Sequence, residues 1–147
     1  MSLTPSPALQ NLERVKKLKA EPPDSRECAA LLRSAEIRLG DAQNVSLSIE
    51  SQFDLVYNAA HAAALAALRR HGYRSDNRYL VFQCLQHTLH WSAEQWRLLD
   101  VAHHKRNLAE YEGDLTIDQA FVKELIAAVR QLVDAVRALL VSEGWGG

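Results

Sequence analysis

The chain has 147 residues, a formal net charge of −1 at pH 7 and a hydrophobic fraction of 48%. This length suits one domain, and the composition supports a substantial core and excludes a disordered chain. The nearly neutral charge provides no overall field that would attract nucleic acid or an anionic membrane, so either partner would need a local patch.

No apolar run approaches the roughly 18 residues of a membrane span, and the N-terminus shows no signal-peptide pattern. The two cysteines, Cys28 and Cys84, lie far apart and match no metal-binding spacing. We therefore expect reduced, buried thiols in a cytoplasmic protein without a membrane partner.

Helical periodicity runs through most of the chain, whereas strand signals are nearly absent. Residues 1–23 are expected to be an N-terminal extension with one short, basic amphipathic helix, which Pro22-Pro23 ends. The apolar face of this helix is formed by Leu9, Leu12, Val15 (or Lys16) and Leu18. The next helix begins at Asp24, which can cap it while Glu27 reaches back to the cap.

A long helix over about 48–71 follows, and its middle, residues 59–67, is alanine apart from His61 and Leu65. Small side chains allow a neighbouring helix to approach closely, and alanine has the highest helix propensity. Gly72 ends this helix, and residues 73–76 are expected to form a turn. Residues 77–90 form a shorter helix that is apolar on most sides, which is typical of a central position.

Two capping boxes mark the last two helices, Ser92 with Gln95 and Thr116 with Gln119. Gly113 lies just past the end of the first, and the second runs to about residue 142, before a tail over 143–147. Short loops between long helices favour antiparallel neighbours. The sequence predicts an all-α, antiparallel up-and-down bundle of five principal helices over 24–142, plus the short N-terminal helix. The pattern of the last helix fits packing within the chain or against a second copy.

The densest set of polar side chains lies at residues 103–113. At 3.6 residues per turn, His103, Asn107 and Tyr111 form one stripe, which Arg106 flanks. Arg106 could hold a phosphate. His103 or the adjacent His104 could act as general acid or base, and Tyr111 could donate a hydrogen bond or stack on a base.

An alternative interpretation of the same residues needs no ligand. Cationic side chains in the last turn offset the negative end of the helix dipole. Arg106 could simply pair with Glu110 at spacing i, i+4, and Tyr111 could be a core ring with its hydroxyl at the surface. Residue types alone favour this alternative.

Metal binding and nucleophilic catalysis have less support. His87, His90, His103 and His104 supply four imidazoles, but no Glu-x-x-His or Cys-x-x-Cys accompanies them. The sequence contains no phosphate loop, dinucleotide fingerprint or Gly-x-Ser-x-Gly. We expect neither a metal nor a cofactor. His61 is interpreted as an ordinary core histidine unless its helix faces the polar stretch.

Two segments together resemble the HEPN family of helical proteins. Residues 53–68, closing in His71-Gly72-Tyr73, look like the long helix of HEPN domains, with an aromatic residue, an alanine-rich run and then Leu and Gly. Residues 106–111 resemble the HEPN motif, an Arg followed by a polar residue and, a few positions on, a His. The resemblance covers about residues 25–140.

The resemblance implies a bundle that forms a homodimer, with Arg106 and Asn107 facing a phosphate in the cleft between protomers. Many HEPN proteins are metal-independent endoribonucleases of toxin–antitoxin and defence systems, and the implied partner is a small nucleotidyltransferase. The sequence departs from the motif where the His should stand, because Tyr111, Glu112 and Gly113 occupy those positions. A phenol with an ordinary pKa of about 10 is a poor base at pH 7.

Three functions follow from these observations. The first is a non-catalytic or weakly catalytic HEPN-like dimer that binds a nucleotide, RNA or a protein partner through a polar cleft around Arg106–Tyr111, with Asn107 and His61 as further contacts. The second is a divergent endoribonuclease with Arg106 on the phosphate and His103, His104 or Tyr111 as acid or base. The third is a structural helical adaptor. The missing His favours the first and the third.

Overall fold

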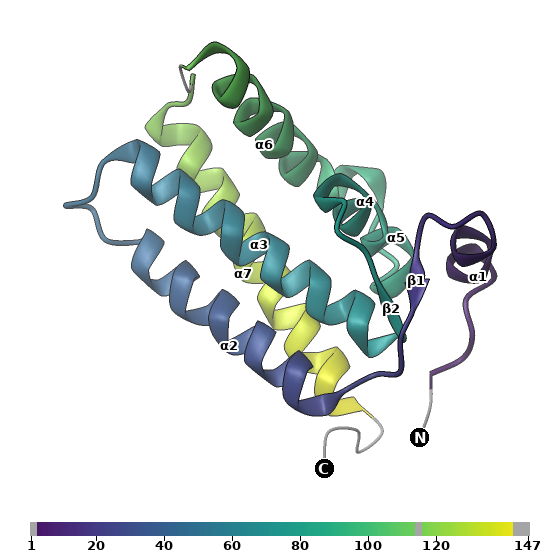
Figure 1. Ribbon diagram of the computed structural model, residues 1–147. Coiled ribbons are helices and arrows are strands. Elements are labelled where there is room, and N and C mark those ends of the chain that lie inside the picture. Colours follow the sequence, from purple (N-terminus) through teal and green to yellow (C-terminus); the bar gives the residue numbers. More distant parts are fainter. Residues whose placement is uncertain (1–2, 114–115, 143–147) are drawn as a thin grey trace.

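The computed structural model describes residues 3–113 and 116–142 (Figure 1). Four long helices run alternately up and down the molecule: α2 (Ser25–Ala42), α3 (Ile49–Arg70), α6 (Ala93–Glu112) and α7 (Gln119–Val141). The shorter elements are α1 (Pro7–Arg14), α4 (Arg78–Gln83), α5 (Leu85–Thr88) and the two-residue strands β1 (Lys19–Ala20) and β2 (Tyr73–Arg74). The predicted all-α, antiparallel bundle is confirmed.

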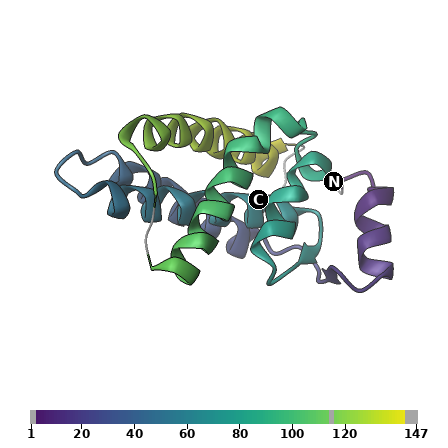
Figure 2. The ribbon, with the colours of Figure 1, turned by 90° about the horizontal axis from the view of Figure 1, so that it is seen from above.

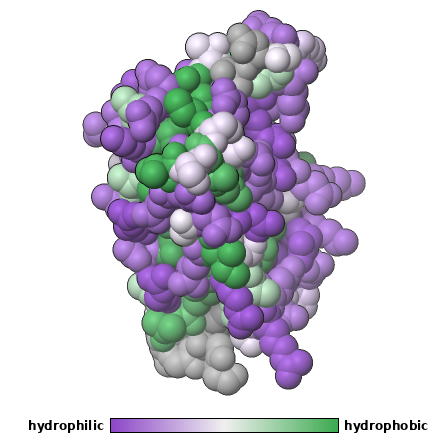
Figure 3. Space-filling model, turned by 90° about the vertical axis from the view of Figure 1, so that its left-hand side faces the viewer, coloured by the Kyte–Doolittle hydropathy of each residue, from purple (hydrophilic) through white to green (hydrophobic). Residues whose placement is uncertain are grey.

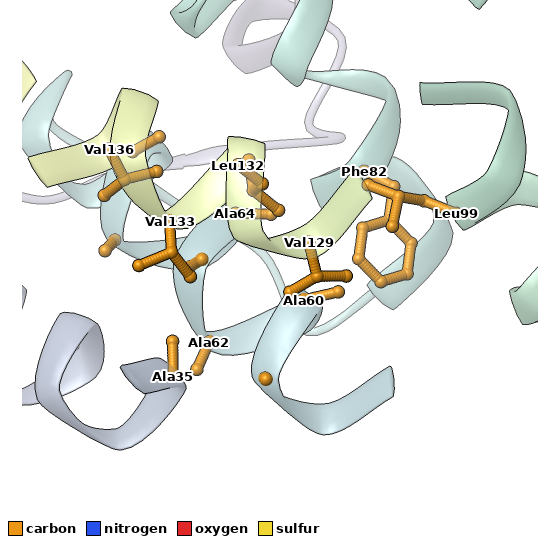
Figure 4. Packing of buried hydrophobic residues seen from close by; sticks show 14 of the residues in the cluster. Ala35, Ala60, Ala62, Ala64, Phe82, Leu99, Val129, Leu132, Val133 and Val136 are labelled. Atoms are coloured by element: carbon orange, nitrogen blue, oxygen red, sulfur yellow. The ribbon is translucent and has the colours of Figure 1, made fainter. Parts of the chain in front are cut away.

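The central helix is α3, whose alanine-rich middle is buried almost throughout. Ala60 and Ala64 lie against Val129 and Leu132 of α7, while Ala62 on another side faces α2 (Figure 4). Seen from above, α7 lies over the layer that α2 and α3 form (Figure 2). Because alanine adds little bulk, two helices approach α3 closely on different sides. The apolar stripe of α7 is thus buried within the chain.

The N-terminal arm, residues 3–23, differs from its prediction. The first helix ends at Arg14, and Val15, predicted to lie on its apolar face, is 53% exposed. The chain then turns and forms β1, which pairs antiparallel with β2 in the register Lys19↔Arg74 and Ala20↔Tyr73. The expectation of a simple turn at 73–76 was therefore wrong, because the first two of those residues supply the second strand.

A buried arginine fastens this arm to the end of α3. Arg69 is 1% exposed, and its Nε donates to Glu27 Oε1 at 2.7 Å. Its Nη1 and Nη2 donate to the carbonyl oxygens of Glu21 and Pro22 at 2.9 and 2.7 Å. Arg74 also binds the carboxylates of Glu21 and Glu27. The buried charge is thus both paired and hydrogen-bonded, as burial of a guanidinium requires.

Three local predictions were wrong for reasons of hydrogen bonding. Glu27 does not reach back to its helix cap, because Arg69 and Arg74 hold its carboxylate. The predicted helix over 77–90 divides at Cys84, whose carbonyl oxygen accepts from the amides three and four residues on. The last helix begins after Asp118, whose carboxylate accepts from the amide of Phe121, rather than at the predicted cap of Thr116 with Gln119.

The other helix boundaries match their sequence signals. Asp24 caps α2 by accepting from the amides of Arg26 and Glu27. Ser92 and Gln95 form the predicted reciprocal capping box at the start of α6. Gly113 ends α6 with φ at +74°, a left-handed conformation that suits glycine because it has no Cβ.

The surface shows no broad apolar band on the side that bears the α2–α3 loop, where apolar patches alternate with hydrophilic side chains (Figure 3). Among the described residues, the most exposed large apolar side chains are Tyr111 at 93%, Val45 at 87% and Val141 at 68%, which lie on α6, in the α2–α3 loop and on α7. Within residues 3–113 and 116–142, no helix has the length and apolar character needed to cross a bilayer. The predicted tail over 143–147 lies outside the described residues.

Candidate functional site

Five polar side chains from three helices, α3, α4 and α6, lie close together. Tyr57 comes from α3, Arg78 from α4, and His103, Arg106 and Asn107 from α6. We call these five residues the Tyr57 cluster. Its centre is the Tyr57 ring, which is 1% exposed, while Asn107 lies at the surface. The cluster therefore extends from the core to solvent.

A hydrogen-bonded chain passes through His103. Its Nδ1 lies 3.0 Å from Tyr57 Oη, and its Nε2 lies 3.1 Å from Asn107 Nδ2. Because an amide nitrogen is a donor, Nε2 accepts from Asn107, and the ring proton on Nδ1 donates to Tyr57 Oη. Both ring nitrogens are thus occupied, which fixes the orientation of the imidazole.

Two arginines lie against the same tyrosine ring. The Cζ atom of Arg106 lies 5.0 Å from the centroid of the Tyr57 ring, and that of Arg78 lies 5.6 Å from it. Both distances are within the range of cation–π attraction. Arg78 Nη1 donates to the amide oxygen of Asn58 at 3.1 Å. Arg106 Nη1 contacts Glu110 Oε1 at 3.1 Å, but that carboxylate is 63% exposed.

The cluster is electropositive, as the pKa values of nearby groups indicate. Burial lowers the pKa of His103, and the charges of His104 and Arg106 lower it further. Burial lowers the pKa of His61 to about 4, with Arg78 and Arg106 adding to the effect. Burial also raises the pKa of Tyr57, although both arginines oppose that rise. Within the described residues Arg78 has no carboxylate partner, and the partner of Arg106 is exposed. Together with neutral histidines, these guanidiniums favour an anion at this place.

The candidate residues that were predicted within the polar stretch 103–113 occupy different places in the structure. Arg106, Asn107 and His103 lie together, with the predicted ion pair between Arg106 and Glu110 present. His104 is on the outer side, where its Nδ1 contacts the carbonyl oxygen of Asp100 at 2.9 Å. The interpretation of Tyr111 as a core ring was wrong, because its side chain is 93% exposed. The predicted stripe of His103, Asn107 and Tyr111 therefore begins beside the core at His103 and reaches open solvent two turns later at Tyr111.

His61 meets the condition that made it of interest. Its helix, α3, faces the polar stretch, because Tyr57, one turn earlier, contacts His103. The His61 ring is half-buried and lies edge-on to Phe82, with ring centroids 6.2 Å apart. It therefore flanks the Tyr57 cluster from the core side and feels its charges.

Sequence analysis missed Tyr57, Arg78 and Tyr79 as members or neighbours of the site. Tyr79 completes an aromatic wall, with its ring 5.4 Å from that of His103 and 5.8 Å from that of His104. These residues lie 24 to 46 positions away in sequence from His103, so no local spacing joins them. The only signal was Arg78, a cation at the start of a helix that is otherwise apolar.

Histidines do not gather into a metal centre in the part of the chain that the structure describes. No group of three or more His, Cys, Asp or Glu side chains there is arranged to hold a metal ion. His87 and His90 lie on and after α5, while His103 and His104 belong to α6. The four imidazoles that the sequence supplies therefore lie in two separate pairs, one at α5 and one on α6.

Comparison with known proteins adds no relative. No protein-family model, curated protein or solved structure matches the chain.

Proposed function

We propose that the protein is a non-catalytic, HEPN-like binding protein that holds a phosphate of RNA or of a nucleotide at the Tyr57 cluster. The observation that carries the proposal is the pair of guanidiniums, Arg78 and Arg106, set against one buried tyrosine ring. Within the described residues Arg78 forms no ion pair, since its acceptor is the neutral amide of Asn58. A phosphate would supply the missing counter-charge.

Ligand exchange at Arg106 is feasible because its present partner is a solvent-exposed carboxylate. An exposed i, i+4 ion pair stabilises a helix by only about 0.3–0.5 kcal/mol. A phosphate that accepts two hydrogen bonds from a guanidinium binds more strongly than this. Asn107, exposed beside Arg106, can donate a further hydrogen bond to a phosphate oxygen or a base edge.

Binding is better supported than cleavage because no general base is in place. Both ring nitrogens of His103 are engaged, by Tyr57 and by Asn107. No histidine follows Arg106 at the motif spacing. A divergent endoribonuclease would need His103 to leave both of its partners or the outward-facing His104 to turn inward.

The HEPN resemblance supplies the rest of the proposal. We propose a homodimer in which the face that bears Arg106 and Asn107 lines a shared cleft. A small nucleotidyltransferase is the protein partner that this resemblance implies. Gel filtration with light scattering at two protein concentrations tests the dimer, and a monomer mass at about 100 μM would refute it.

The phosphate site is tested by fluorescence anisotropy with a labelled single-stranded RNA of about 20 nucleotides. We expect Arg106→Ala and Arg78→Ala each to weaken binding about tenfold and to reduce the salt slope by about 1. Arg97→Ala is the matched control, because Arg97 is an exposed arginine on the same helix that lies outside the cluster. Equal loss in all three variants would mean that binding follows net charge alone, and the proposed site would be rejected.

Cleavage is tested separately by incubating the protein with total RNA in the presence of EDTA. The proposal predicts intact RNA at high protein concentration. Cleavage that disappears in Arg106→Ala would instead establish the divergent endoribonuclease.

A further inference from the structure

A second cationic site lies outside the Tyr57 cluster, where the N-terminal arm meets the loop between β2 and α4. Figure 1 shows α1 and β1 at the end of the bundle opposite the α2–α3 loop. A hollow of about 540 Å³ lies there. Its charged lining consists of four cations and two acids, Lys16, Lys17, Lys19, Arg74, Glu13 and Asp76. The lining thus has two more cations than acids, although one of the cations, Arg74, is also paired with Glu21 and Glu27 outside the hollow.

The three lysines of this hollow lack partners for their ammonium groups. Lys16, Lys17 and Lys19 are all exposed. Within residues 3–113 and 116–142, their side chains form no hydrogen bond or ion pair, whereas Arg14 just before them bonds to Asn11. Like charges this close in sequence repel one another, so an anion placed between them is attracted by all three.

The backbone holds these lysines in place rather than leaving them on a loose loop. Lys16 has φ at +64°, a left-handed conformation that is costly for a residue with a Cβ. Its amide donates to the carbonyl oxygen of Glu13 at 2.9 Å, and the next amide, of Lys17, donates to that of Leu12 at 2.8 Å. Lys19 is fixed by pairing with Arg74 across β1 and β2. The cationic turn is therefore an ordered element of the arm.

Arg74 offers a positioned donor on the opposite wall. Its Nε and Nη2 are held by Glu21 and Glu27. Among the described contacts, Nη1 has no acceptor, although the side chain is 33% exposed and lines the hollow. A guanidinium whose other nitrogens are fixed loses little conformational entropy when its last nitrogen binds a ligand.

We propose that this hollow binds a small anion that carries two or more phosphoryl groups, such as inorganic pyrophosphate or the polyphosphate of a nucleoside triphosphate. The volume falls in the range of small-molecule sites, about 300–1,000 Å³. The lining is rich in ammonium groups rather than aromatic side chains, so it favours a compact polyanion over an apolar compound. One phosphoryl group would lie between Lys16 and Lys17, and the next would accept from Lys19 and Arg74 Nη1.

The proposal is tested by isothermal titration of the full chain with sodium pyrophosphate and with ATP, in the absence of added metal. The variant Lys16→Gln/Lys17→Gln/Lys19→Gln removes three charges but keeps side chains of similar length and the backbone pairing. We expect it to weaken binding about tenfold or more. The matched control removes three exposed charges elsewhere, by Arg26→Gln, Arg33→Gln and Lys123→Gln. We expect this control to change the affinity less than about twofold.

Saturable binding of either probe that is lost in the lysine variant and kept in the control supports the proposal. Absence of saturable binding at about 1 mM pyrophosphate and ATP overturns it. Equal weakening in the control also overturns it, since the effect would then be one of net charge. Binding of a 20-nucleotide RNA that is weakened in the lysine variant and that pyrophosphate does not displace would assign the hollow to a nucleic-acid surface and overturn the small-anion site. Arg78 and Arg106 are unchanged in both variants, so ATP bound at the Tyr57 cluster would stay bound in the lysine variant. Binding of both probes that is kept in the lysine variant therefore overturns the site in the hollow without bearing on the Tyr57 cluster.

Discussion

Acidification is predicted to destabilise the protein through His61. The folded pKa of this side chain is lowered by burial to about 4, from an ordinary value of 6.5. Between these two pH values the unfolded chain binds a proton at this position and the folded chain does not. The free energy of unfolding therefore falls as the pH falls from about 6.5 to about 4.

The size of this loss follows from the difference between the two pKa values. A difference of this size corresponds to about 3.4 kcal/mol if the ring were fully enclosed. Because one edge of the half-buried ring remains accessible to water, we expect about 2 kcal/mol. The charges of Arg78 and Arg106 contribute to this penalty, since each disfavours a protonated imidazole nearby.

Urea unfolding at pH 7 and at pH 4.5 provides the measurement. The variant His61→Leu keeps a side chain of similar size but cannot bind a proton. Its free energy of unfolding should fall about 1.4 kcal/mol less than that of the wild type between the two pH values, since pH 4.5 is still above the folded pKa. Comparison at pH 7 gives the packing cost of the substitution alone. Identical losses on acidification for wild type and His61→Leu would refute the reasoning, and would assign the acid sensitivity to other groups.

Three further substitutions test the structure. Arg69→Ala leaves two carbonyl oxygens without their donor and Glu27 with Arg74 alone, and should lower the free energy of unfolding by about 3 kcal/mol in urea; a loss below about 1 kcal/mol would contradict the buried network. Tyr57→Phe removes the partner of His103 Nδ1 and should cost about 1 kcal/mol by thermal unfolding, whereas an unchanged midpoint would mean that this hydrogen bond is absent. Gly113→Ala meets no atom within 4 Å, so its cost should be the backbone penalty alone, about 1 kcal/mol, and a much larger loss would reveal a hidden contact.

The fold was readable from the sequence wherever a signal is local. The capping box of Ser92 with Gln95 and the closing glycine, Gly113, bound α6 as predicted. The periodic apolar stripe of the last helix is buried, as its helical periodicity leads one to expect, whereas Val15, predicted on the apolar face of the first helix, is exposed. Local signals failed where a competing residue stood nearby, as when Asp118 rather than Thr116 capped α7. They also failed at β1 and β2, since two-residue strands carry no alternation to detect.

The candidate site was only half readable, because it is assembled across helices. Periodicity placed His103 and Asn107 on one stripe, and they do bond to each other. The periodicity of one helix does not predict which residues of other helices contact its stripe, so Tyr57 and Arg78 were missed. Arg69 was missed for a similar reason: at the end of a helix a cation is normally solvated, and only the returning arm encloses it.

The contacts of Arg69 have a consequence for how the chain opens and closes. Its guanidinium takes carbonyl acceptors from Glu21 and Pro22, and the amide of Glu21 donates to the carbonyl oxygen of Gly72. Detaching the arm would therefore expose the end of α3 and remove the carbonyl acceptors of the Arg69 guanidinium. Amide hydrogen exchange at Glu21 should then be as slow as in the bundle helices, unlike that of a freely fraying terminal segment. A chain shortened to begin at Asp24 lacks the arm, and we therefore expect it to unfold less cooperatively than the full chain.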